Sequence, residues 1–247
     1  MSGYALVTGT SSGLGRGLAG QLQQRGWRVY GCSRRGCDIA GVRDVQVDLS
    51  DHERIDEALT GLLDDSPRLD LVVLNAGVLG EIRDMTQTPL ADLQRIMDIN
   101  VWANKVILDW LHAWERPLGQ VVLVSSGAAV LGNRGWGGYA LSKATLNMLA
   151  RLYAHEFPAT HICALAPGII DTSMMDYLCN EADAKRFPAL GRLRRARGTA
   201  AMPDADAAAQ RLVEVLPALR ERPSGDFVDI REILEPDEYA RLFGGRR

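Results

Sequence analysis

The feature that most constrains the fold is an alternation of short apolar runs with longer amphipathic segments along the 247 residues. Six runs have the length and β-branched content of buried strands, and a seventh candidate lies near the C-terminus. They span 4–8, 27–32, 45–48, 71–75, 120–125, 161–166 and, as the candidate, 225–230. Helical patterns occupy 15–25, 51–63, 90–114 and 139–157. This order predicts an α/β fold: a single doubly wound Rossmann domain, with a mostly parallel sheet of about seven strands and helices on both faces.

The composition is ordinary for a globular chain, with 47% hydrophobic residues, 24% charged residues and a formal net charge of −3. A nucleic-acid partner would require a basic excess or stripe, which is missing. No apolar run reaches the length of a membrane span, and the N-terminus begins with a strand pattern rather than a signal peptide. We therefore expect no nucleic-acid or membrane partner and a cytoplasmic location. The cysteines have no CxxC spacing, so we expect reduced thiols and no metal site.

Neither a linker nor an internal repeat divides the chain, so we expect residues 1–247 to form one domain. The pattern becomes irregular after Pro167, and we expect a substrate-loop insertion around 171–203. Long insertions in compact domains are usually functional or mobile. Two interpretations of this segment stay open, a substrate lid and a solvated helix face. Its arginines are Arg192, Arg194, Arg195 and Arg197.

A glycine-rich turn follows the first predicted strand and opens the first predicted helix. It consists of Thr8-Gly9-Thr10-Ser11-Ser12-Gly13-Leu14-Gly15. Glycines at such a turn permit a tight bend, the approach of backbone to a pyrophosphate, and close packing of helix on strand. The helix N-terminus points its free N–H groups at the anion. The turn therefore predicts a dinucleotide site, although its spacing differs from the common GxGxxG.

The pattern Thr-Gly-x-x-x-Gly-x-Gly resembles the cofactor motif of the short-chain dehydrogenase/reductase (SDR) family. Further matches follow in order up to about residue 172: Asp48, Asn75-Ala76-Gly77, Asn100, Ser126 thirteen residues before Tyr139, Tyr139-x-x-x-Lys143, and Pro167-Gly168 with Thr172. The resemblance implies cofactor contacts from Thr8, Gly9, Ser11, Ser12, Gly13, Leu14, Gly15, Ser33, Arg34, Asp48, Leu49, Asn75, Ala76, Gly77, Tyr139, Lys143, Pro167, Gly168, Ile170 and Thr172.

The catalytic residues implied by the resemblance are Asn100, Ser126, Tyr139 and Lys143. Tyr139 and Lys143 are four apart on a predicted helix and so share a face. An ammonium beside a phenol lowers a pKa that is ordinarily about 10, which would make Tyr139 the general acid/base. Ser126 would stabilise the developing oxyanion. Asn100 would position a water that links Lys143 to solvent, or it would only satisfy backbone groups at a helix kink.

The end of the second predicted strand bears on the cofactor. An acidic residue here would bind the adenosine ribose of NAD and repel a 2′-phosphate. Ser33 stands in that place, and the guanidinium of Arg34 suits a phosphate, so NADP(H) is favoured over NAD(H). Ser12 departs from this pattern, because many NADP-preferring members carry a basic residue there. Arg34 and Arg35 could also be ordinary loop charges.

We expect a small carbonyl or alcohol substrate. The resemblance to the benzil reductase and sepiapterin reductase branch implies reduction of a ketone or an α-dicarbonyl. The pocket is expected to be lined by Ala128, Val130, Trp136, Ile169 and parts of 171–197. Trp136 would wall an aromatic substrate or pack in its loop. The arginines of the segment would attract an anionic substrate or be solvated.

Segments 90–114 and 139–157 correspond to the interface helices of the family. Trp110 and Trp114 share a helix face, which would mark an interface or simply the side packed on the sheet. We therefore expect a homodimer or homotetramer. Two other functions stay open. An NAD-linked alcohol dehydrogenase of the same fold would be separated by its cofactor preference. A non-catalytic NADP(H)-sensing protein would tend to lack Tyr139 or Lys143, and both are present.

Overall fold

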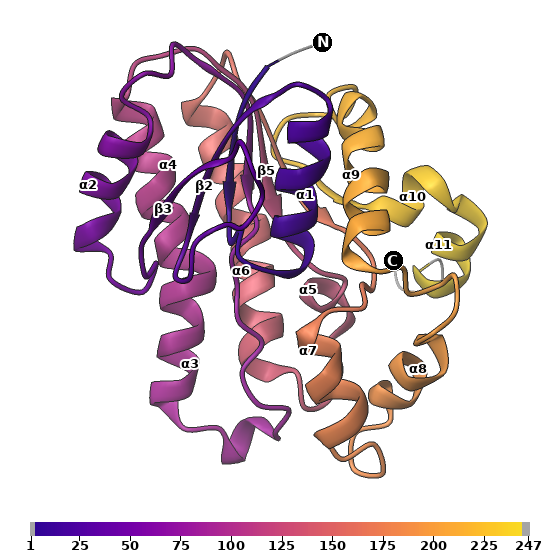
Figure 1. The fold of residues 1–247 in the computed structure, drawn as a ribbon. Coiled ribbons are helices and arrows are strands. Elements are labelled where there is room, and N and C mark those ends of the chain that lie inside the picture. The colour runs from indigo at the N-terminus through magenta and orange to yellow at the C-terminus, as the bar shows by residue number, and fades with distance from the viewer. Residues whose placement is uncertain (1–2, 244–247) are drawn as a thin grey trace.

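A computed structural model describes residues 3–243 and contains a seven-stranded parallel sheet (Figure 1). The strands are β1 (Tyr4–Thr8), β2 (Arg28–Ser33), β3 (Arg43–Gln46), β4 (Leu69–Leu74), β5 (Leu118–Val124), β6 (His161–Ala166) and β7 (Phe227–Asp229). They lie in the order β3-β2-β1-β4-β5-β6-β7. The direction of winding reverses between β1 and β4, which opens a crevice at the carboxyl ends of the strands. The predicted fold class is confirmed.

Helices cover both faces of the sheet (Figure 1). The α-helices are α1 (Gly13–Gln24), α2 (Glu53–Leu62), α3 (Leu90–Met97), α4 (Ala103–Ala113), α5 (Ala128–Leu131), α6 (Gly137–Glu156), α7 (Ser173–Asp176), α8 (Ala189–Ala196), α9 (Ala205–Leu219), α10 (Ile230–Leu234) and α11 (Pro236–Phe243). A 3-10 turn, η1 (Met85–Gln87), and two π-helical turns, η2 (Asp98–Trp102) and η3 (Tyr177–Glu181), complete the set.

The two apolar layers follow the alternation of side chains along each strand. Leu6 packs into the layer with α2, α4 and α6, whereas its neighbour Val7 packs into the layer with α1 and α9. Both residues are fully buried. Strands buried on both faces read as continuous apolar runs, which explains why the sequence revealed them.

Several strand limits differ by one or two residues from the sequence prediction, and those of β3 and β7 have a visible physical reason. β3 runs over Arg43–Gln46 rather than 45–48, because Asp48 accepts a hydrogen bond from the backbone N–H of Ser50 and turns the chain there. β7 is limited to Phe227–Asp229 rather than 225–230. The side chain of Asp229 caps the following α10 by accepting from the N–H of Arg231.

The stretch 90–114 was predicted as one helix and instead changes type in the middle. α3 and α4 are joined by the π-helical turn η2. A π turn holds one more residue than an α turn and needs tertiary contacts to stabilise it. Asn100 lies in η2 and supplies such contacts, described below.

Segment 171–203 is more regular than its sequence suggested. It contains α7, η3 and α8, which have only four, five and eight residues. Pieces this short do not display a helical period over a window of ordinary length. Their apolar side chains form a cluster of their own, centred on the buried residues Met175, Leu178, Phe187, Leu190, Leu193 and Met202.

The one-domain prediction for 1–247 remains a prediction, and residues 1–2 and 244–247 lie outside the described part of the chain. Within that part, no helix combines the length and apolar character needed to cross a membrane.

Candidate active site

The glycine-rich turn between β1 and α1 forms one end of a cavity of about 590 Å³. Gly9 and Gly13 have φ angles of +79° and +56°, a region that favours glycine. A Cβ on Gly15 would collide with the carbonyl oxygen of Gly9, so only glycine lets α1 pack this closely. Ser12 makes no side-chain cap to α1, which leaves first-turn N–H groups for an anion. These features fit the pyrophosphate of a dinucleotide.

Thr8 positions the neighbouring wall of the cavity. Its fully buried hydroxyl accepts hydrogen bonds from the backbone N–H groups of Asn75 and Ala76 at 2.9 and 3.0 Å. The Asn75 amide donates in return to the Thr8 carbonyl at 2.9 Å. These bonds fix the ends of β1 and β4 side by side. Asn75, Ala76 and Gly77 consequently line the cavity next to the glycine turn.

A basic cluster lies at the end of β2. Arg34 and Arg35 line the cavity and are exposed, while Ser33 is buried and accepts a hydrogen bond from the N–H of Gly36. Arg35 donates to the hydroxyl of Ser12 at 3.2 Å. The cation that the sequence lacks at position 12 is therefore supplied in space from β2. The sequence argument had given the main role to Arg34 and had left Arg35 as an accessory.

Asp48 and Leu49 line the same end of the cavity. The Asp48 carboxylate accepts from both the backbone N–H and the hydroxyl of Ser50, at 3.0 and 2.8 Å. These hydrogen bonds hold the pKa of Asp48 below its usual value. Asp48 is consequently an ionised acceptor at the edge of the cavity at neutral pH.

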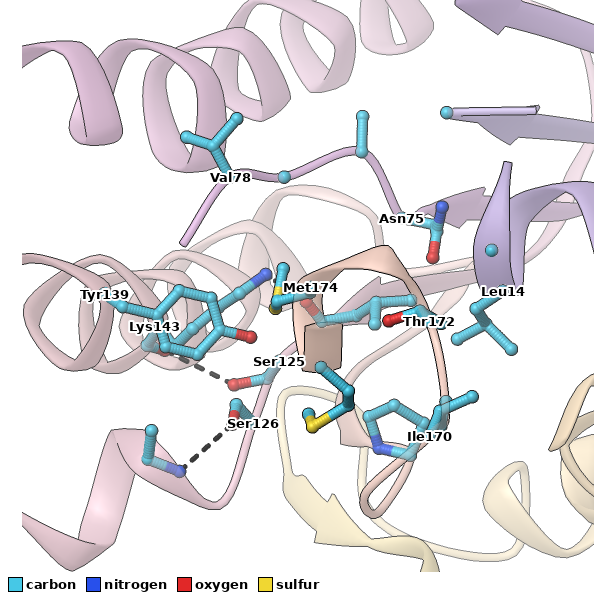
Figure 2. A pocket seen from close by; sticks show the side chains of 18 of the residues that line it. Leu14, Asn75, Val78, Ser125, Ser126, Tyr139, Lys143, Ile170, Thr172 and Met174 are labelled. Atoms are coloured by element: carbon cyan, nitrogen blue, oxygen red, sulfur yellow. Dashed lines mark hydrogen bonds between the residues drawn. The ribbon is translucent and has the colours of Figure 1, made fainter. Parts of the chain in front are cut away.

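Ser126, Tyr139 and Lys143 meet on one wall of the cavity, and Figure 2 shows them across from Leu14 and Thr172. Tyr139 and Lys143 are the third and seventh residues of α6, so they share a face. The Lys143 ammonium donates to the Val124 carbonyl at 2.6 Å and lies 5.6 Å from the centre of the Tyr139 ring. The Ser126 hydroxyl accepts from the N–H of Ala128 at 3.1 Å.

Burial governs the protonation of this group. Lys143 is 3% exposed, and burial lowers its pKa to about 8. Burial also raises the pKa of Tyr139, and a hydrogen bond with Ser126 opposes that rise. The sequence argument had expected Lys143 to lower the pKa of Tyr139. In this structure desolvation is the larger effect, so Tyr139 holds its proton at neutral pH and is a donor.

Asn100 is fully buried behind this wall and does not line the cavity. Its Oδ1 accepts from the N–H of Val78 at 2.7 Å, and its Nδ2 donates to the Val78 carbonyl and to the Ser142 hydroxyl, each at 2.9 Å. Both amide hydrogens are thus used by the protein, and only Oδ1 has acceptor capacity left for a water. From its place in the π turn, the Asn100 side chain thus satisfies the backbone N–H and C=O of Val78 in the loop after β4.

The opposite end of the cavity is largely apolar. Ala128, Trp136 and Ile169 line it as expected, and Val130 does not, because it lies on the outer side of α5 and is 53% exposed. Trp136 lies 6.2 Å from Tyr139, centre to centre. Parts of 171–197 also line it, as expected, and the residues concerned include Met174, Met175, Leu178, Ala189 and Leu193. Leu131 and Asn133 line it as well and were not predicted.

Segment 171–203 is joined to the loop after β4. The Tyr177 hydroxyl accepts from the N–H of Ile82 at 3.0 Å. The carboxylate of Asp84 accepts from Arg134 and from Arg186, each at 2.7 Å. The two guanidinium groups hold the pKa of Asp84 well below its usual range. The segment therefore has both a polar connection and an apolar cluster that fix it over the cavity.

The predicted residues divide into two groups. The cavity wall includes every predicted cofactor residue except Thr8 and Gly15, which lie behind it. Among the wall residues, Ser11 and Leu14 come from the glycine-rich turn, and Pro167, Gly168, Ile170 and Thr172 come from the segment after β6.

The cysteines Cys32, Cys37, Cys163 and Cys179 are all free thiols. Burial raises the pKa of Cys32 and Cys163 to about 12.

Known proteins share both the sequence and the fold of this chain. A family model described as short chain dehydrogenase matches residues 3–183. The chain is 31% identical over 244 residues to the benzil reductase ((S)-benzoin forming) of Bacillus subtilis, covering 93% of this chain and 98% of that one.

Solved structures share the fold. A short chain dehydrogenase from Burkholderia cenocepacia in complex with NADP has a TM-score of 0.74 at 24% identity, covering 91% of this chain and 94% of that one. A 3-ketoacyl-(acyl-carrier-protein) reductase from Brucella melitensis, complexed with NADH, has a TM-score of 0.75 at 20% identity and covers 92% of this chain and 96% of that one. Both cofactors thus occur on this fold.

Proposed function

We propose that this chain, which belongs to the short-chain dehydrogenase/reductase family, is an NADP(H)-dependent oxidoreductase that reduces the carbonyl group of a small molecule, with Tyr139 as the proton donor. The family resemblance noted in the sequence is confirmed by the match over residues 3–183. The observation that carries the proposal is a single cavity lined both by the glycine-rich turn and by Ser126, Tyr139 and Lys143. A dinucleotide and a second small molecule would meet there.

The roles of the side chains follow from their protonation and position. NADPH, when bound, supplies the hydride that the carbonyl carbon accepts. Tyr139 gives its phenolic proton to the carbonyl oxygen, so that C=O becomes CH–OH. Ser126 donates a hydrogen bond to the same oxygen and stabilises its developing charge. Lys143 stabilises the phenolate that remains until a proton from solvent restores the phenol.

Charge at the end of β2 supports NADP(H) over NAD(H). Arg34 and Arg35 line the cavity there, and Arg35 reaches the hydroxyl of Ser12 beside the glycine turn. Ser33 stands at the position where an acidic residue would repel a 2′-phosphate. The two guanidinium groups and the two hydroxyls make a site suited to a phosphate dianion.

The apolar end of the cavity supports a ketone or an α-dicarbonyl compound with an aromatic group. Trp136 gives a flat wall next to Tyr139, and Met174 and Leu178 are adaptable and apolar. The relative from Bacillus subtilis is named for the reduction of benzil, an aromatic α-diketone. We propose that residues 171–203 form the substrate loop over this end.

A homodimer or homotetramer in the cytoplasm is part of the same proposal. Leu141, Met148 and Leu152 lie on one face of α6, each more than half exposed, and Trp102 on η2 is also exposed. This stripe supports assembly through α6. Trp110 and Trp114 stack on each other and pack, partly buried, against the core, which fits the alternative that they face the sheet.

The proposal is tested by following NADPH absorbance with a panel of ketones, α-diketones, quinones and pterins, with NADH and the variant Tyr139→Phe in parallel. We expect turnover of an α-diketone with NADPH, and a loss of about 10²- to 10⁴-fold in kcat in the variant. Faster turnover with NADH would identify an NAD-linked alcohol dehydrogenase instead. Tight NADPH binding without turnover of any substrate would favour the sensor function.

A further inference from the structure

Four arginines of segment 171–203 have different environments. Arg194 donates to the Ala182 carbonyl at 2.7 Å, and Arg197 forms ion pairs with Asp171 and Asp176 at 2.9 and 2.5 Å. Arg195 is exposed. Arg192 alone among the four lines the cavity.

The orientation of Arg192 follows from its place on α8. Ala189, Arg192 and Leu193 all line the cavity, and their spacing of three and four residues puts them on one helix face. Leu193 is buried in the apolar cluster of the segment, against which Tyr139 and Trp136 also pack. Arg192 therefore belongs to the substrate end of the cavity rather than to the outer surface of the segment.

Arg192 has no counter-ion within ion-pair distance among residues 3–243. It is half-buried, and burial together with the nearby charge of Arg231 lowers its pKa, while the more distant carboxylates of Glu238 and Asp229 act in the opposite direction. Arg231 is itself paired with the buried Asp229 at 2.5 Å. A guanidinium keeps its charge in proteins, so partial burial without a partner is unfavourable until an anion arrives.

The rest of the wall offers no anion at this end. Asp48 is the one carboxylate among the described residues that line the cavity, and it lies with the arginines that follow β2. At the substrate end, Arg231 and Arg241 add further positive charge. Arg231 and Arg241 have carboxylate partners in Asp229 and Glu238, so Arg192 is the cation at this end that an anionic ligand would pair with directly.

We propose that Arg192 binds an anionic group of the substrate, and that the preferred substrates are carbonyl compounds that carry a carboxylate. This inference rests on the proposed carbonyl reduction for the meaning of "substrate". The planar guanidinium can hold both carboxylate oxygens at once, which would set the orientation of the carbonyl toward Tyr139. Arg192 is then a specificity-determining residue.

The test compares acids with their own methyl esters. Benzoylformate has the carboxylate on the carbonyl carbon, and 3-benzoylpropionate has it two methylenes away. Their dissociation constants from the NADP⁺-loaded protein are measured by titration calorimetry for the wild type, Arg192→Met and Arg195→Met. We expect Arg192→Met to weaken at least one acid by about 10- to 100-fold, the range for a hydrogen bond to a charged group. The esters should change less than about 2-fold, and the matched control Arg195→Met should behave as wild type.

Three results would overturn the inference. Equal weakening of acid and ester would make Arg192 a packing residue. Weaker NADPH binding in Arg192→Met, with unchanged discrimination of acid from ester, would mean that Arg192 binds a phosphate of the cofactor rather than the substrate. Failure of the wild type to bind either acid would rule out carbonyl compounds with a carboxylate as the preferred substrates. Binding is measured without turnover, so an Arg192-dependent acid that is never reduced would contradict the proposed reaction and leave the anion site standing.

Discussion

The two ends of the cavity are built in different ways. The end beside the glycine turn consists of loops that directly follow the parallel strands β1, β2 and β4, and its shape depends on backbone and on the contacts of Thr8 and Gly15. The end beside Trp136 is covered by segment 171–203, whose short helices pack through side chains into a cluster of their own. The sheet itself determines the shape of the first end, whereas the second end is a separately packed segment that is attached to the sheet domain by side-chain contacts.

This difference separates binding of the cofactor from choice of the substrate. Backbone groups that approach a phosphate demand glycine at particular positions, so the first end tolerates little change. Apolar side chains of similar size replace one another more easily, so the residues that line the second end can be substituted while the apolar cluster stays packed. We therefore expect substitutions at one end to act there and to add to those at the other.

The largest expected effect that tests this separation comes from Leu190→Ala. Leu190 is fully buried in the cluster of segment 171–203. Its truncation should cost about 2–5 kcal/mol of local stability, mainly through the cavity that it leaves. Amide exchange within 173–196 should then become at least about 30-fold faster. Hydrogen exchange read by mass spectrometry measures this, and NADPH affinity should stay within about 2-fold. A parallel loss of NADPH affinity would show that the two ends fold as one unit.

The next effect is on cofactor choice and uses Arg35→Ala. Loss of the guanidinium beside Ser12 should weaken NADPH by about 10- to 100-fold and leave NADH within about 3-fold. Fluorescence titration with each cofactor gives both constants. Arg25→Ala, at an exposed arginine after α1, is the control. A uniform loss for both cofactors would contradict a role for Arg35 in binding the 2′-phosphate.

A smaller effect is expected from Gly13→Ala, with Gly26→Ala as its matched control. Both glycines have positive φ, +56° and +78°, and both flank α1. Each alanine should cost about 1–2 kcal/mol of stability through backbone strain. Only Gly13→Ala should also weaken NADPH, by about 10-fold, because only Gly13 lines the cavity. Thermal unfolding and cofactor titration on the same samples separate the two consequences.

The smallest effect concerns the connection between the two regions, through Asp84→Asn. Arg134 and Arg186 lower the pKa of Asp84, so its contribution is complete above the unfolded pKa of about 4 and is lost as the pH falls toward the lower folded value. At pH 7 the variant should exchange amides of 183–187 about 2- to 5-fold faster than wild type. The difference in exchange rate between the variant and the wild type should become smaller below about pH 4. A difference that does not change with pH would mean that the carboxylate charge does not hold the segment.

The sequence predicted the first end well because its requirements are local. Gly9, Gly13 and Asn75 follow strands that read clearly as apolar runs, so both position and chemistry were visible. The π turn at Asn100 was missed, since the bonds that stabilise it go to Val78 and Ser142, more than twenty residues away.

The second end was predicted only in outline for the same kind of reason. Met174 and Leu178 line the cavity through helices too short to show a period, and nothing in the sequence singled out Arg192 from the arginines beside it. Its distinction is that it lines the cavity and has no described carboxylate within ion-pair distance, which is a property of the fold.

The charges on the cavity wall also have a kinetic consequence. The wall of the cavity carries Arg34, Arg35, Lys143 and Arg192, with Asp48 as its one carboxylate among the described residues, in a chain whose net charge is −3. Arg231 and Arg241 also line it but are paired with Asp229 and Glu238. Positive charge is therefore concentrated at the cavity. Anionic ligands should therefore be guided to the opening, and their association rate should fall as added salt shortens the Debye length below about 10 Å. Phosphate or sulfate in a buffer would compete for the same field, so Michaelis constants measured in such buffers would describe the buffer as much as the protein.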